Sequence, residues 1–344
     1  MKALQLVRFG SPDNAFELRE LPEPRPGAGE VSIDVSASGL NFADVIARSG
    51  AYPDCPPLPC TLGYEVVGRI RELGAGVTGV TVGQRVIAFT RFGGYASCVV
   101  TRAAAAVPIP DALSDGAAAA LATQGATAWF MAEDTLRLHA GEHVLVQAAA
   151  GGVGLILVQL AKARGCVVYG TASSPEKLDY LRSIGVDHPI QYTKVDFADA
   201  IREIQGTTRR GLDVVYDSLG GSYYAKARKL LCAGGRIVCF GAAAAAGEKK
   251  SLLKLLGLAW GFGLTWPLPW LMESKGFLGV NMLRISDEKP ATLQRCLAGV
   301  VKFWASGQLK LHVGGEFPAE QVAEAHKALG GRGTMGKVIL RWKE

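Results

Sequence analysis

A cluster of glycines follows an apolar run near the middle of the chain. Val144-Leu145-Val146 leads through four residues into Gly151-Gly152-Val153-Gly154, and the residues up to Arg164 repeat apolar side chains at helical spacing. The segment therefore predicts a strand, a tight turn and a helix. Unpaired N–H groups at the start of a helix, at the positive end of its dipole, suit a pyrophosphate. The residues expected to form this dinucleotide-binding loop are Ala150, Gly151, Gly152, Val153 and Gly154.

The match to the G-x-G-x-x-G pattern is incomplete, because Ala149 stands at the first glycine position. A purely structural turn is the alternative interpretation. The surroundings favour the dinucleotide loop, since strand-like runs at 167–171, 212–217 and 236–241 alternate with helical patterns such as 175–184. This alternation predicts a doubly wound, six-stranded parallel sheet with helices on both faces, that is, a Rossmann domain.

The end of the second strand indicates which dinucleotide is bound. NAD enzymes present a carboxylate there to the ribose 2′-OH, whereas this chain has Ala172 followed by Ser173, Ser174 and Lys177. A carboxylate would repel a 2′-phosphate, so its absence beside two hydroxyls and an ammonium group favours NADPH. The alternative is that one serine only caps the helix opened by Pro175 and that the lysine is solvated.

The composition limits the classes of protein to which the chain can belong. Its 344 residues allow two domains, and 49% hydrophobic residues are ample for two cores. The net charge of +6 is dispersed, which does not favour nucleic-acid binding. Seven cysteines without a C-x-x-C pair, and a strand-like rather than signal-like start, predict a reduced, cytoplasmic compartment.

Residues 1–121 have a different pattern of residue types from the middle of the chain. Short alternating runs, such as 31–35 and 66–70, are punctuated by glycines and predict a β-rich, barrel-like domain. Strand patterns return after a helix around 291–306 and end at 336–340. We therefore expect residues 1–121 and 308–344 to form one domain and residues 122–307 the Rossmann domain, with a cleft between them.

This order of domains resembles the medium-chain dehydrogenase/reductase superfamily over essentially the whole chain. Gly39-Leu40-Asn41-Phe42-Ala43-Asp44, Arg48-Ser49-Gly50-Ala51-Tyr52-Pro53 and Ala149-Ala150-Gly151-Gly152-Val153-Gly154 resemble the zeta-crystallin-type quinone oxidoreductases. Gly279-Val280-Asn281-Met282-Leu283-Arg284-Ile285 is closer to the vesicle amine transport protein homologues of the same branch. The resemblance implies an α/β architecture with a GroES-like β-barrel catalytic domain beside the Rossmann domain.

The departures from the zinc alcohol dehydrogenases are equally informative. At the three positions where those enzymes place zinc ligands, the resemblance aligns Asn41, Tyr64 and Thr123. Amide, phenol and hydroxyl groups do not replace the thiolate, imidazole or carboxylate ligands that a catalytic zinc requires. We therefore expect no metal.

Without zinc, the protein must stabilise the developing charge with hydrogen bonds. A quinone, or a carbonyl conjugated to C=C, accepts hydride and spreads charge onto oxygen, so it needs donors rather than a strong Lewis acid. The candidate catalytic donors are Asn41, Tyr52 and Tyr64. Tyr52 resembles the tyrosine that enoyl-thioester reductases use near the reacting carbons, but it could only pack against the nicotinamide. Asn41 could instead tie down its own loop, and Asp44 is expected to make structural hydrogen bonds.

Further cofactor contacts are implied by the same resemblance. Thr127 resembles the family threonine near the nicotinamide ribose, although a threonine inside a helix can simply bond its own backbone. Tyr192 would cover the adenosine end. The remaining expected contacts are Phe240, Gly241 and Asn281.

The segment 252–272 is unusually rich in tryptophan and leucine. Its glycines and prolines, and its place between two expected strands of one sheet, argue against a membrane span. We expect it to line the cleft or a dimer interface, and attachment to a membrane surface is the alternative.

The sequence therefore predicts a cytoplasmic, zinc-independent, NADPH-dependent reductase of quinones or α,β-unsaturated carbonyl compounds. We expect a homodimer formed through the sixth strand, with peripheral membrane contact as a possible addition. Two alternatives stay open: a nucleotide-binding trafficking or lipid-handling protein with little turnover, and a dedicated natural-product biosynthetic enzyme.

Overall fold

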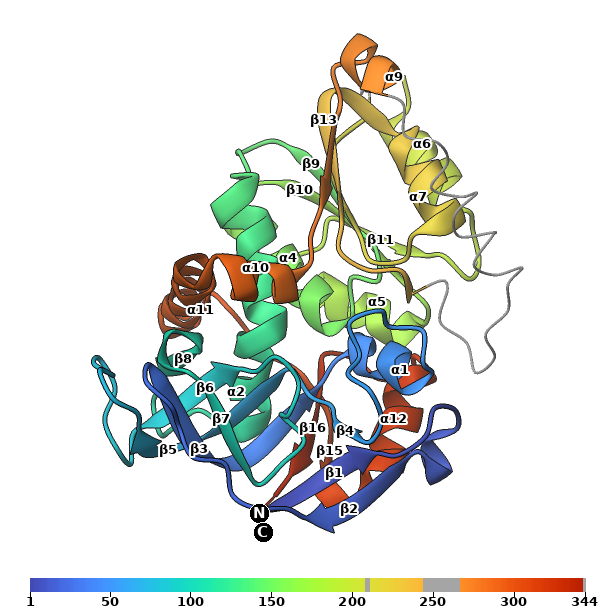
Figure 1. Ribbon diagram of the computed structural model, residues 1–344. Coiled ribbons are helices and arrows are strands. Elements are labelled where there is room, and N and C mark those ends of the chain that lie inside the picture. The colour runs from blue at the N-terminus through green and yellow to red at the C-terminus, as the bar shows by residue number, and fades with distance from the viewer. Residues whose placement is uncertain (208–210, 244–266, 343–344) are drawn as a thin grey trace. The chain divides into compact units, whose positions relative to one another are not determined.

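The computed structural model describes residues 1–207, 211–243 and 267–342 (Figure 1). The chain divides into two compact units. Unit 1 comprises Met1–Thr127, Met282–Gly307 and Leu311–Glu344, and unit 2 comprises Ala128–Asn281 and Gln308–Lys310.

Unit 1 is built on two sheets. The larger has the strand order β15-β16-β3-β5-β6-β8, with β7 also paired to β3, and the smaller has the order β2-β1-β4. The strands are β1 (Lys2–Leu6), β2 (Phe16–Glu20), β3 (Glu30–Leu40), β4 (Cys60–Thr61), β5 (Glu65–Leu73), β6 (Arg85–Phe89), β7 (Cys98–Arg102), β8 (Ala106–Pro108), β15 (Val313–Pro318) and β16 (Lys337–Arg341). The helical segments are η1 (Pro12–Asn14), α1 (Phe42–Arg48), η2 (Ala103–Ala105), α2 (Asp115–Ala120), η3 (Leu121–Gly125), α3 (Ala126–Trp129), α10 (Met282–Glu288), α11 (Pro290–Ala305), η6 (Ala319–Gln321) and α12 (Val322–Gly330).

The strand β3 organises this unit. It pairs with β5, β7 and β16, so its inward side chains are shared among several neighbours. Val31, Ile33 and Val35 alternate along it and pack with Val66 and other buried side chains in one core. The two predicted runs, 31–35 and 66–70, lie within β3 and β5, and the predicted β-rich domain is confirmed.

Unit 2 contains one parallel sheet with the order β11-β10-β9-β12-β13-β14. This is the order of a doubly wound Rossmann sheet, so that prediction is confirmed as well. The strands are β9 (His143–Val146), β10 (Val167–Ala172), β11 (His188–Gln191), β12 (Leu212–Asp217), β13 (Leu231–Cys239) and β14 (Gly276–Gly279). The helical segments are η4 (Phe130–Thr135), α4 (Gly152–Ala163), α5 (Pro175–Ser183), α6 (Phe197–Gln205), α7 (Gly221–Arg228) and α9 (Pro267–Met272).

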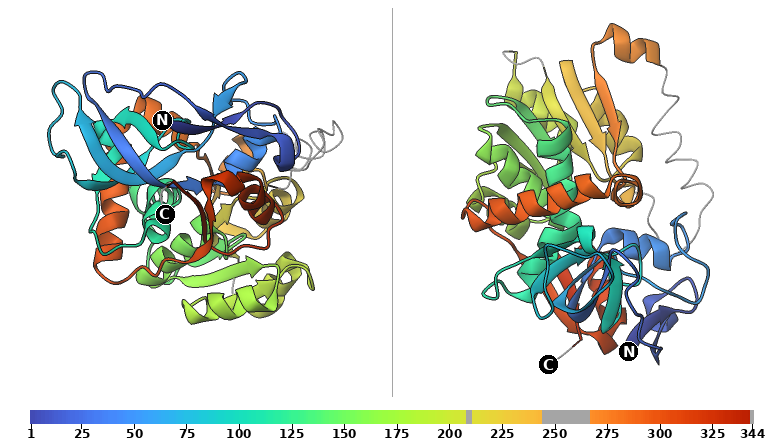
Figure 2. Two further views of the ribbon diagram at one scale, coloured as in Figure 1. Left: turned by 90° about the horizontal axis from the view of Figure 1, so that it is seen from below. Right: turned by 60° about the vertical axis from the view of Figure 1, so that its left-hand side comes forward.

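Helices cover both faces of this sheet, as Figures 1 and 2 show. The helices α6 and α7 share one buried cluster, in which Ile201 and Tyr224 pack on Leu145 and Val215 from the strands. The helices α4 and α5 contact β9, β10 and β11. Because all six strands are parallel, the loops that follow them emerge at one edge of the sheet, where dinucleotides bind in such folds.

The two units differ from the predicted domain boundaries at residues 122–127, 282–307 and 308–310. Residues 122–307 were expected to belong to the Rossmann domain, whereas α10 and α11 are part of unit 1. The helix α11 contacts η2, η3 and β8. A Cβ on Gly125 would lie 3.1 Å from the Val300 side chain, so the missing side chain allows α11 to pack closely on η3.

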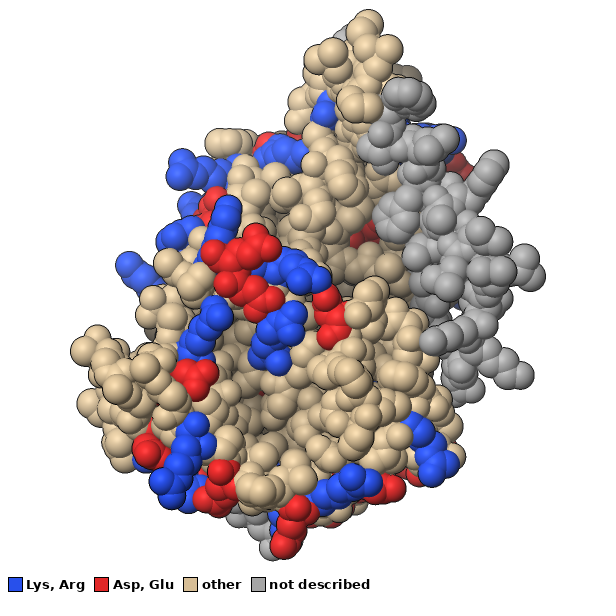
Figure 3. Space-filling model, in the orientation of Figure 1, with Lys and Arg blue, Asp and Glu red and all other residues tan. Residues whose placement is uncertain are grey.

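The face of the molecule drawn in Figure 3 carries Lys and Arg intermingled with Asp and Glu. Two ion pairs join segments of unit 1, Arg91 with Asp287 at 2.8 Å and Arg284 with Asp54 at 2.5 Å. Mixed charge of this kind differs from the basic stripe of a nucleic-acid-binding surface. In the part of the chain that the structure describes, no helix has the length and hydropathy needed to span a membrane.

Candidate functional site

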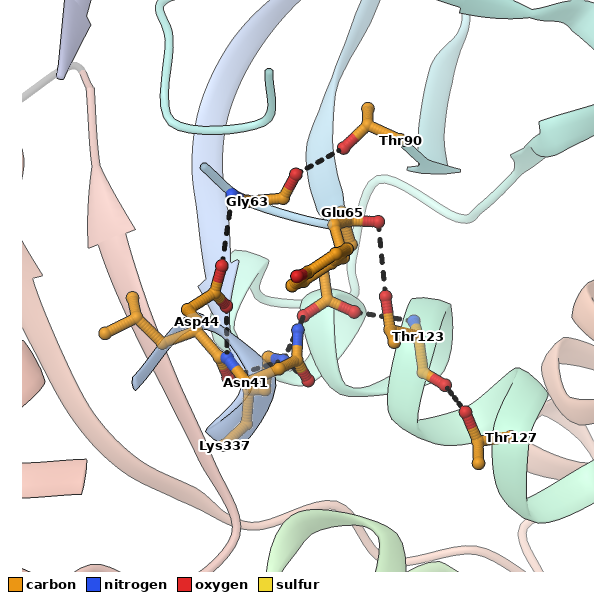
Figure 4. A network of polar contacts seen from close by, with 10 residues as sticks. Asn41, Asp44, Gly63, Glu65, Thr90, Thr123, Thr127 and Lys337 are labelled. Atoms are coloured by element: carbon orange, nitrogen blue, oxygen red, sulfur yellow. Dashed lines mark hydrogen bonds and ion pairs between the residues drawn. The ribbon is translucent and has the colours of Figure 1, made fainter. Parts of the chain in front are cut away.

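A buried polar network occupies the centre of unit 1 (Figure 4). The Lys337 ammonium and the Glu65 carboxylate form an ion pair in which both side chains are fully buried. Glu65 also accepts hydrogen bonds from Asn41 Nδ2 at 2.8 Å and from the Thr123 backbone N–H at 2.5 Å. Lys337 donates to the Leu40 carbonyl at 3.1 Å and to Asn41 Oδ1 at 3.3 Å. The network therefore connects β3, β5, η3 and β16.

The Asn41 side chain is held within this network. Its nitrogen donates to Glu65, its oxygen accepts from Lys337, and the residue is 8% exposed. This geometry favours the structural interpretation of Asn41 over that of a substrate-facing donor.

Tyr64 lies in a cluster of aromatic side chains next to the network. Its ring centroid is 6.2 Å from that of Tyr52 and 5.1 Å from that of Phe92. The Tyr64 hydroxyl is buried and has no hydrogen-bond partner of normal geometry within the described part of the chain, although the Tyr52 hydroxyl is near enough to affect its pKa. Burial raises the pKa of both Tyr52 and Tyr64 above its usual value. Both phenols therefore keep their protons at neutral pH, as a hydrogen-bond donor must.

Asp44 has the structural role predicted for it. Its carboxylate accepts from the Asn41 N–H at 2.8 Å and from the Gly63 N–H at 3.1 Å, which ties the start of α1 to the loop before β5. The residue is fully buried, and burial raises the pKa of Asp44 to about 7. The two N–H donors oppose this rise, because they favour the charged form.

Thr127 bonds its own helix. Its hydroxyl donates to the carbonyl of Thr123, four residues earlier, at 2.6 Å. This is the alternative considered for a threonine inside a helix. The bond extends the network of Glu65 by one more turn, as Figure 4 shows.

The glycine loop of unit 2 is a tight turn stabilised by β10. Ala148 has a φ of 49°, and the N–H of Gly151 donates to its carbonyl at 2.9 Å. The Thr171 hydroxyl accepts from the Ala148 N–H at 3.1 Å, and the Thr171 carbonyl accepts from the Ala149 N–H at 2.9 Å. The residue with the left-handed backbone conformation is thus Ala148, and the glycines that follow lie at the start of α4.

Gly154 lets α4 begin close to the turn that follows β9. A Cβ there would lie 2.6 Å from the Ala148 carbonyl oxygen, 2.7 Å from that of Ala149 and 2.8 Å from the Ala149 Cα. A Cβ on Gly151, the residue before α4, would lie 3.1 Å from the Ala148 carbonyl oxygen. Backbone leaves no room for a side chain at Gly154 and little at Gly151, which is the role of glycines in a dinucleotide loop. Ala150 is buried, while Gly152 and Val153 are partly exposed at the start of α4.

Ser174 caps α5, because its Oγ accepts from the Lys177 N–H at 3.5 Å. The Ser173 carbonyl accepts from Gln191 Nε2 at 3.2 Å and from Thr193 Oγ1 at 3.0 Å, which fixes the loop after β10. The Lys177 side chain is half-buried, and burial lowers the pKa of its ammonium. The cap uses the backbone N–H of Lys177, not its ammonium group.

The other expected cofactor residues follow the strands of unit 2. Tyr192 comes after β11, and its ring meets that of Tyr223 edge-on at 6.3 Å. Phe240 and Gly241 come after β13, and a Cβ on Gly241 would lie 2.7 Å from the Ser218 carbonyl oxygen. Asn281 is exposed after β14. All of them follow carboxyl ends of parallel strands, where a bound dinucleotide would lie.

The predicted segment 252–272 is described only from residue 267. Trp260 and Trp266 lie outside the described residues. Trp270 is 8% exposed and packs in the core of unit 2, with the Arg228 guanidinium 4.6 Å from its ring centroid. This tryptophan is therefore a core residue of its own unit.

Sequence reasoning missed Glu65 and Lys337 as members of a site. Each charged residue begins an otherwise apolar strand run, Glu65-Val66-Val67 and Lys337-Val338-Ile339-Leu340. Two isolated charges of opposite sign in buried strands are a signal of pairing, because a buried charge requires a partner.

The structure shows the contacts of the residues at the three positions aligned with zinc ligands. Asn41 and Thr123 bond Glu65, and Tyr64 packs with aromatic rings. Within residues 1–207, 211–243 and 267–342, no three His, Cys, Asp or Glu side chains are grouped to hold a metal ion. None of the seven cysteines, all of which lie in the described ranges, forms a disulfide.

Comparison with known proteins adds the family. Residues 27–111 match the alcohol dehydrogenase GroES-like domain, and residues 152–261 match the zinc-binding dehydrogenase family. The chain is 35% identical to the human synaptic vesicle membrane protein VAT-1 homolog, over 99% of this chain and 86% of that protein. It is 34% identical to a 2-haloacrylate reductase from Burkholderia sp, over 98% of each chain.

A solved structure of a quinone oxidoreductase has a similar fold. The Escherichia coli quinone oxidoreductase complexed with NADPH superposes with a TM-score of 0.85 and 28% sequence identity, covering 99% of this chain and 100% of that one. Fold, loop geometry and sequence agree, and the chain belongs to the medium-chain dehydrogenase/reductase superfamily, in the group that contains the VAT-1 homologues and the quinone oxidoreductases.

Proposed function

We propose that this protein is a zinc-independent, NADPH-dependent reductase of quinones or α,β-unsaturated carbonyl compounds. The observation that carries the proposal is the buried, unbonded hydroxyl of Tyr64, within the described residues, beside the ring of Tyr52. A buried hydroxyl without a hydrogen bond costs about 1–3 kcal/mol. Unlike the equally buried hydroxyl of Tyr216 in β12, that of Tyr64 lies beside a second candidate donor, Tyr52, where a substrate oxygen would remove this cost. Conjugated acceptors need such donors because hydride addition places charge on their oxygen.

The residues of unit 2 fit NADPH. The close approach of Gly154 to the turn after β9 supports a pyrophosphate site at the first N–H groups of α4. Ala172 leaves the end of β10 without a carboxylate, and Ser173, Ser174 and Lys177 would hold the 2′-phosphate. Tyr192, Phe240, Gly241 and Asn281 would complete the binding surface at the same edge of the sheet. When bound, NADPH would supply the hydride.

The residues of unit 1 would stabilise the reduced acceptor. Tyr64 would donate its hydroxyl proton in a hydrogen bond to the oxygen that gains charge. Tyr52 would donate a second hydrogen bond or pack against the nicotinamide. Asn41 and Thr127 would act through the network that holds them rather than on the substrate.

The proposal is tested by following NADPH absorbance with a panel of acceptors. The panel contains a benzoquinone, a naphthoquinone, an aliphatic enone, an enoyl thioester and a saturated aldehyde. We expect turnover with conjugated acceptors and none with the saturated aldehyde. No turnover with any conjugated acceptor, despite tight NADPH binding, would favour a dinucleotide-binding protein without reductase activity.

Lys177→Ala should weaken NADPH binding by roughly tenfold or more and leave NADH binding almost unchanged. A charge-assisted contact with phosphate contributes about 1.5–3 kcal/mol, and NADH lacks the phosphate. Fluorescence titration of both dinucleotides measures the ratio. Lys226→Ala is the control, since this exposed lysine pairs with Asp196 on the surface of the same unit. Equal losses for the two cofactors would show that Lys177 does not bind the phosphate.

We expect metal analysis of the purified protein to find less than stoichiometric zinc, and chelators to leave turnover and Tm unchanged. Asn41, Tyr64 and Thr123 provide none of the three ligand types that a catalytic zinc requires. Elemental analysis and activity after EDTA dialysis measure both. One tightly bound zinc per chain would contradict the zinc-independent mechanism.

A second candidate function rests on exposed apolar side chains beside the edge strand of unit 2. Leu268, Leu271, Met272 and Phe277 are 62%, 73%, 76% and 48% exposed. They would suit a homodimer formed through β14, or contact with a lipid surface in a trafficking or lipid-handling protein of the cytoplasm. Co-sedimentation with liposomes and sedimentation analysis separate the two. Liposome binding without turnover would favour the lipid-handling function.

A further inference from the structure

The buried ion pair of Glu65 and Lys337 lies at the junction of the candidate catalytic segments. Both side chains are 0% exposed, and Gly39 makes room for them, since a Cβ there would lie 2.6 Å from Lys337 Cε and would overlap the Glu65 carboxylate. A buried pair of this kind gives little net stability compared with an apolar pair. Stability alone therefore does not explain the presence of the Glu65–Lys337 pair.

The two oxygens of Glu65 reach two different segments. Oε1 accepts from Asn41, which precedes α1, and Oε2 accepts from the N–H of Thr123, in η3. Thr123 in turn donates its hydroxyl to the Tyr64 carbonyl at 3.2 Å, and Thr90 donates its N–H to the same carbonyl at 2.8 Å. Thr123 thus links the Tyr64 carbonyl to Glu65, and Lys337 neutralises the charge of Glu65.

We propose that Lys337 is a positioning residue for Tyr64: its buried ammonium compensates Glu65, and Glu65 then fixes Asn41 and Thr123 around the Tyr64 backbone. This inference rests on the proposed function for the part that concerns turnover. A side chain of the last strand thus supplies the positive charge at this site, and its ammonium group has three hydrogen-bond donors.

Three variants test the proposal. Lys337→Met removes the cation and leaves a buried carboxylate, Glu65→Gln with Lys337→Met removes both charges, and Arg341→Met removes a surface cation from the same strand that pairs with Glu316. We expect Lys337→Met to lower Tm by about 5–10 °C, the double variant to recover most of that loss, and Arg341→Met to change Tm by about 1 °C or less.

The double variant separates charge compensation from packing. Lys337→Met leaves the Glu65 carboxylate buried without its counter-charge, whereas the double variant buries no charge at this position. A loss of Tm confined to Lys337→Met would reflect the missing charge, and an equal loss in both variants would reflect packing. The titratable groups around Glu65 are Lys337 of β16, Asp44 of α1 and Tyr95 before β7.

Positioning is measured separately from stability. In the double variant we expect faster amide hydrogen exchange at 41–44, 63–65 and 121–127, and a kcat lower by roughly tenfold to a hundredfold with unchanged KM for NADPH. Arg341→Met should match wild type in amide hydrogen exchange and in kcat. Wild-type exchange and kcat in the double variant, or a double variant as unstable as Lys337→Met, would overturn the proposal. Absence of turnover in the wild type, with the exchange and Tm results as expected, would instead count against the proposed function alone.

Discussion

Tyr64→Phe should lower kcat for conjugated acceptors by a factor on the order of 10²–10³ without destabilising the protein. Removing one preorganised donor to a developing oxyanion has a cost of that size. The same change deletes a buried hydroxyl that makes no hydrogen bond within the described residues, while the ring keeps its contacts with Tyr52 and Phe92. Tm should therefore stay constant or rise slightly, because an unsatisfied buried group is removed.

Tyr216→Phe is the matched control. Tyr216 is a fully buried tyrosine of β12 whose hydroxyl also lacks a partner in the described part of the chain. Its removal should leave both kcat and Tm close to wild type. Tyr52→Phe completes the series: a kcat within a factor of about two of wild type would assign Tyr52 to packing. If Tyr64→Phe turns over as fast as Tyr216→Phe, the Tyr64 hydroxyl does not act on the substrate.

Gly154→Val should weaken NADPH binding by at least about a hundredfold. A Cβ at this position would meet backbone atoms of Ala148 and Ala149 at 2.6–2.8 Å, and backbone cannot move aside as a flexible side chain can. The start of α4 must then move away from the turn after β9, and its N–H groups move with it. Overpacking of this kind costs about 1–3 kcal/mol or more, part of which also lowers Tm.

Gly333→Val separates the loop effect from a general effect of replacing glycine. Gly333 has open space around its Cβ position and no left-handed φ, so valine should be accommodated there. Titration of NADPH by fluorescence and thermal unfolding measure both variants. Wild-type NADPH affinity in Gly154→Val would show that the close approach of α4 to the turn after β9 is not needed for binding.

Much of the fold could be predicted from the sequence because its signals are local. Strand and helix periods between 143 and 240 predicted β9, β10, β12 and β13 close to their observed positions, and the missing carboxylate at Ala172 is visible in the sequence itself. The candidate loop at Gly151 to Gly154 follows from the same local patterns. Glycines, alternation and turn residues are properties of neighbouring residues, and they depend little on distant contacts.

The tertiary structure decided what the isolated polar residues do. The sequence alone left Asn41 open between donor and loop anchor, and the choice depends on Lys337, 296 residues away. The partner of Glu65 is likewise on the last strand, because β16 and β5 both pair with β3. Similarly, α11 belongs to unit 1 because it packs on η3 across a glycine. Pairing between strands far apart in the chain leaves no local pattern, and only the folded sheet brings these charges within hydrogen-bond distance.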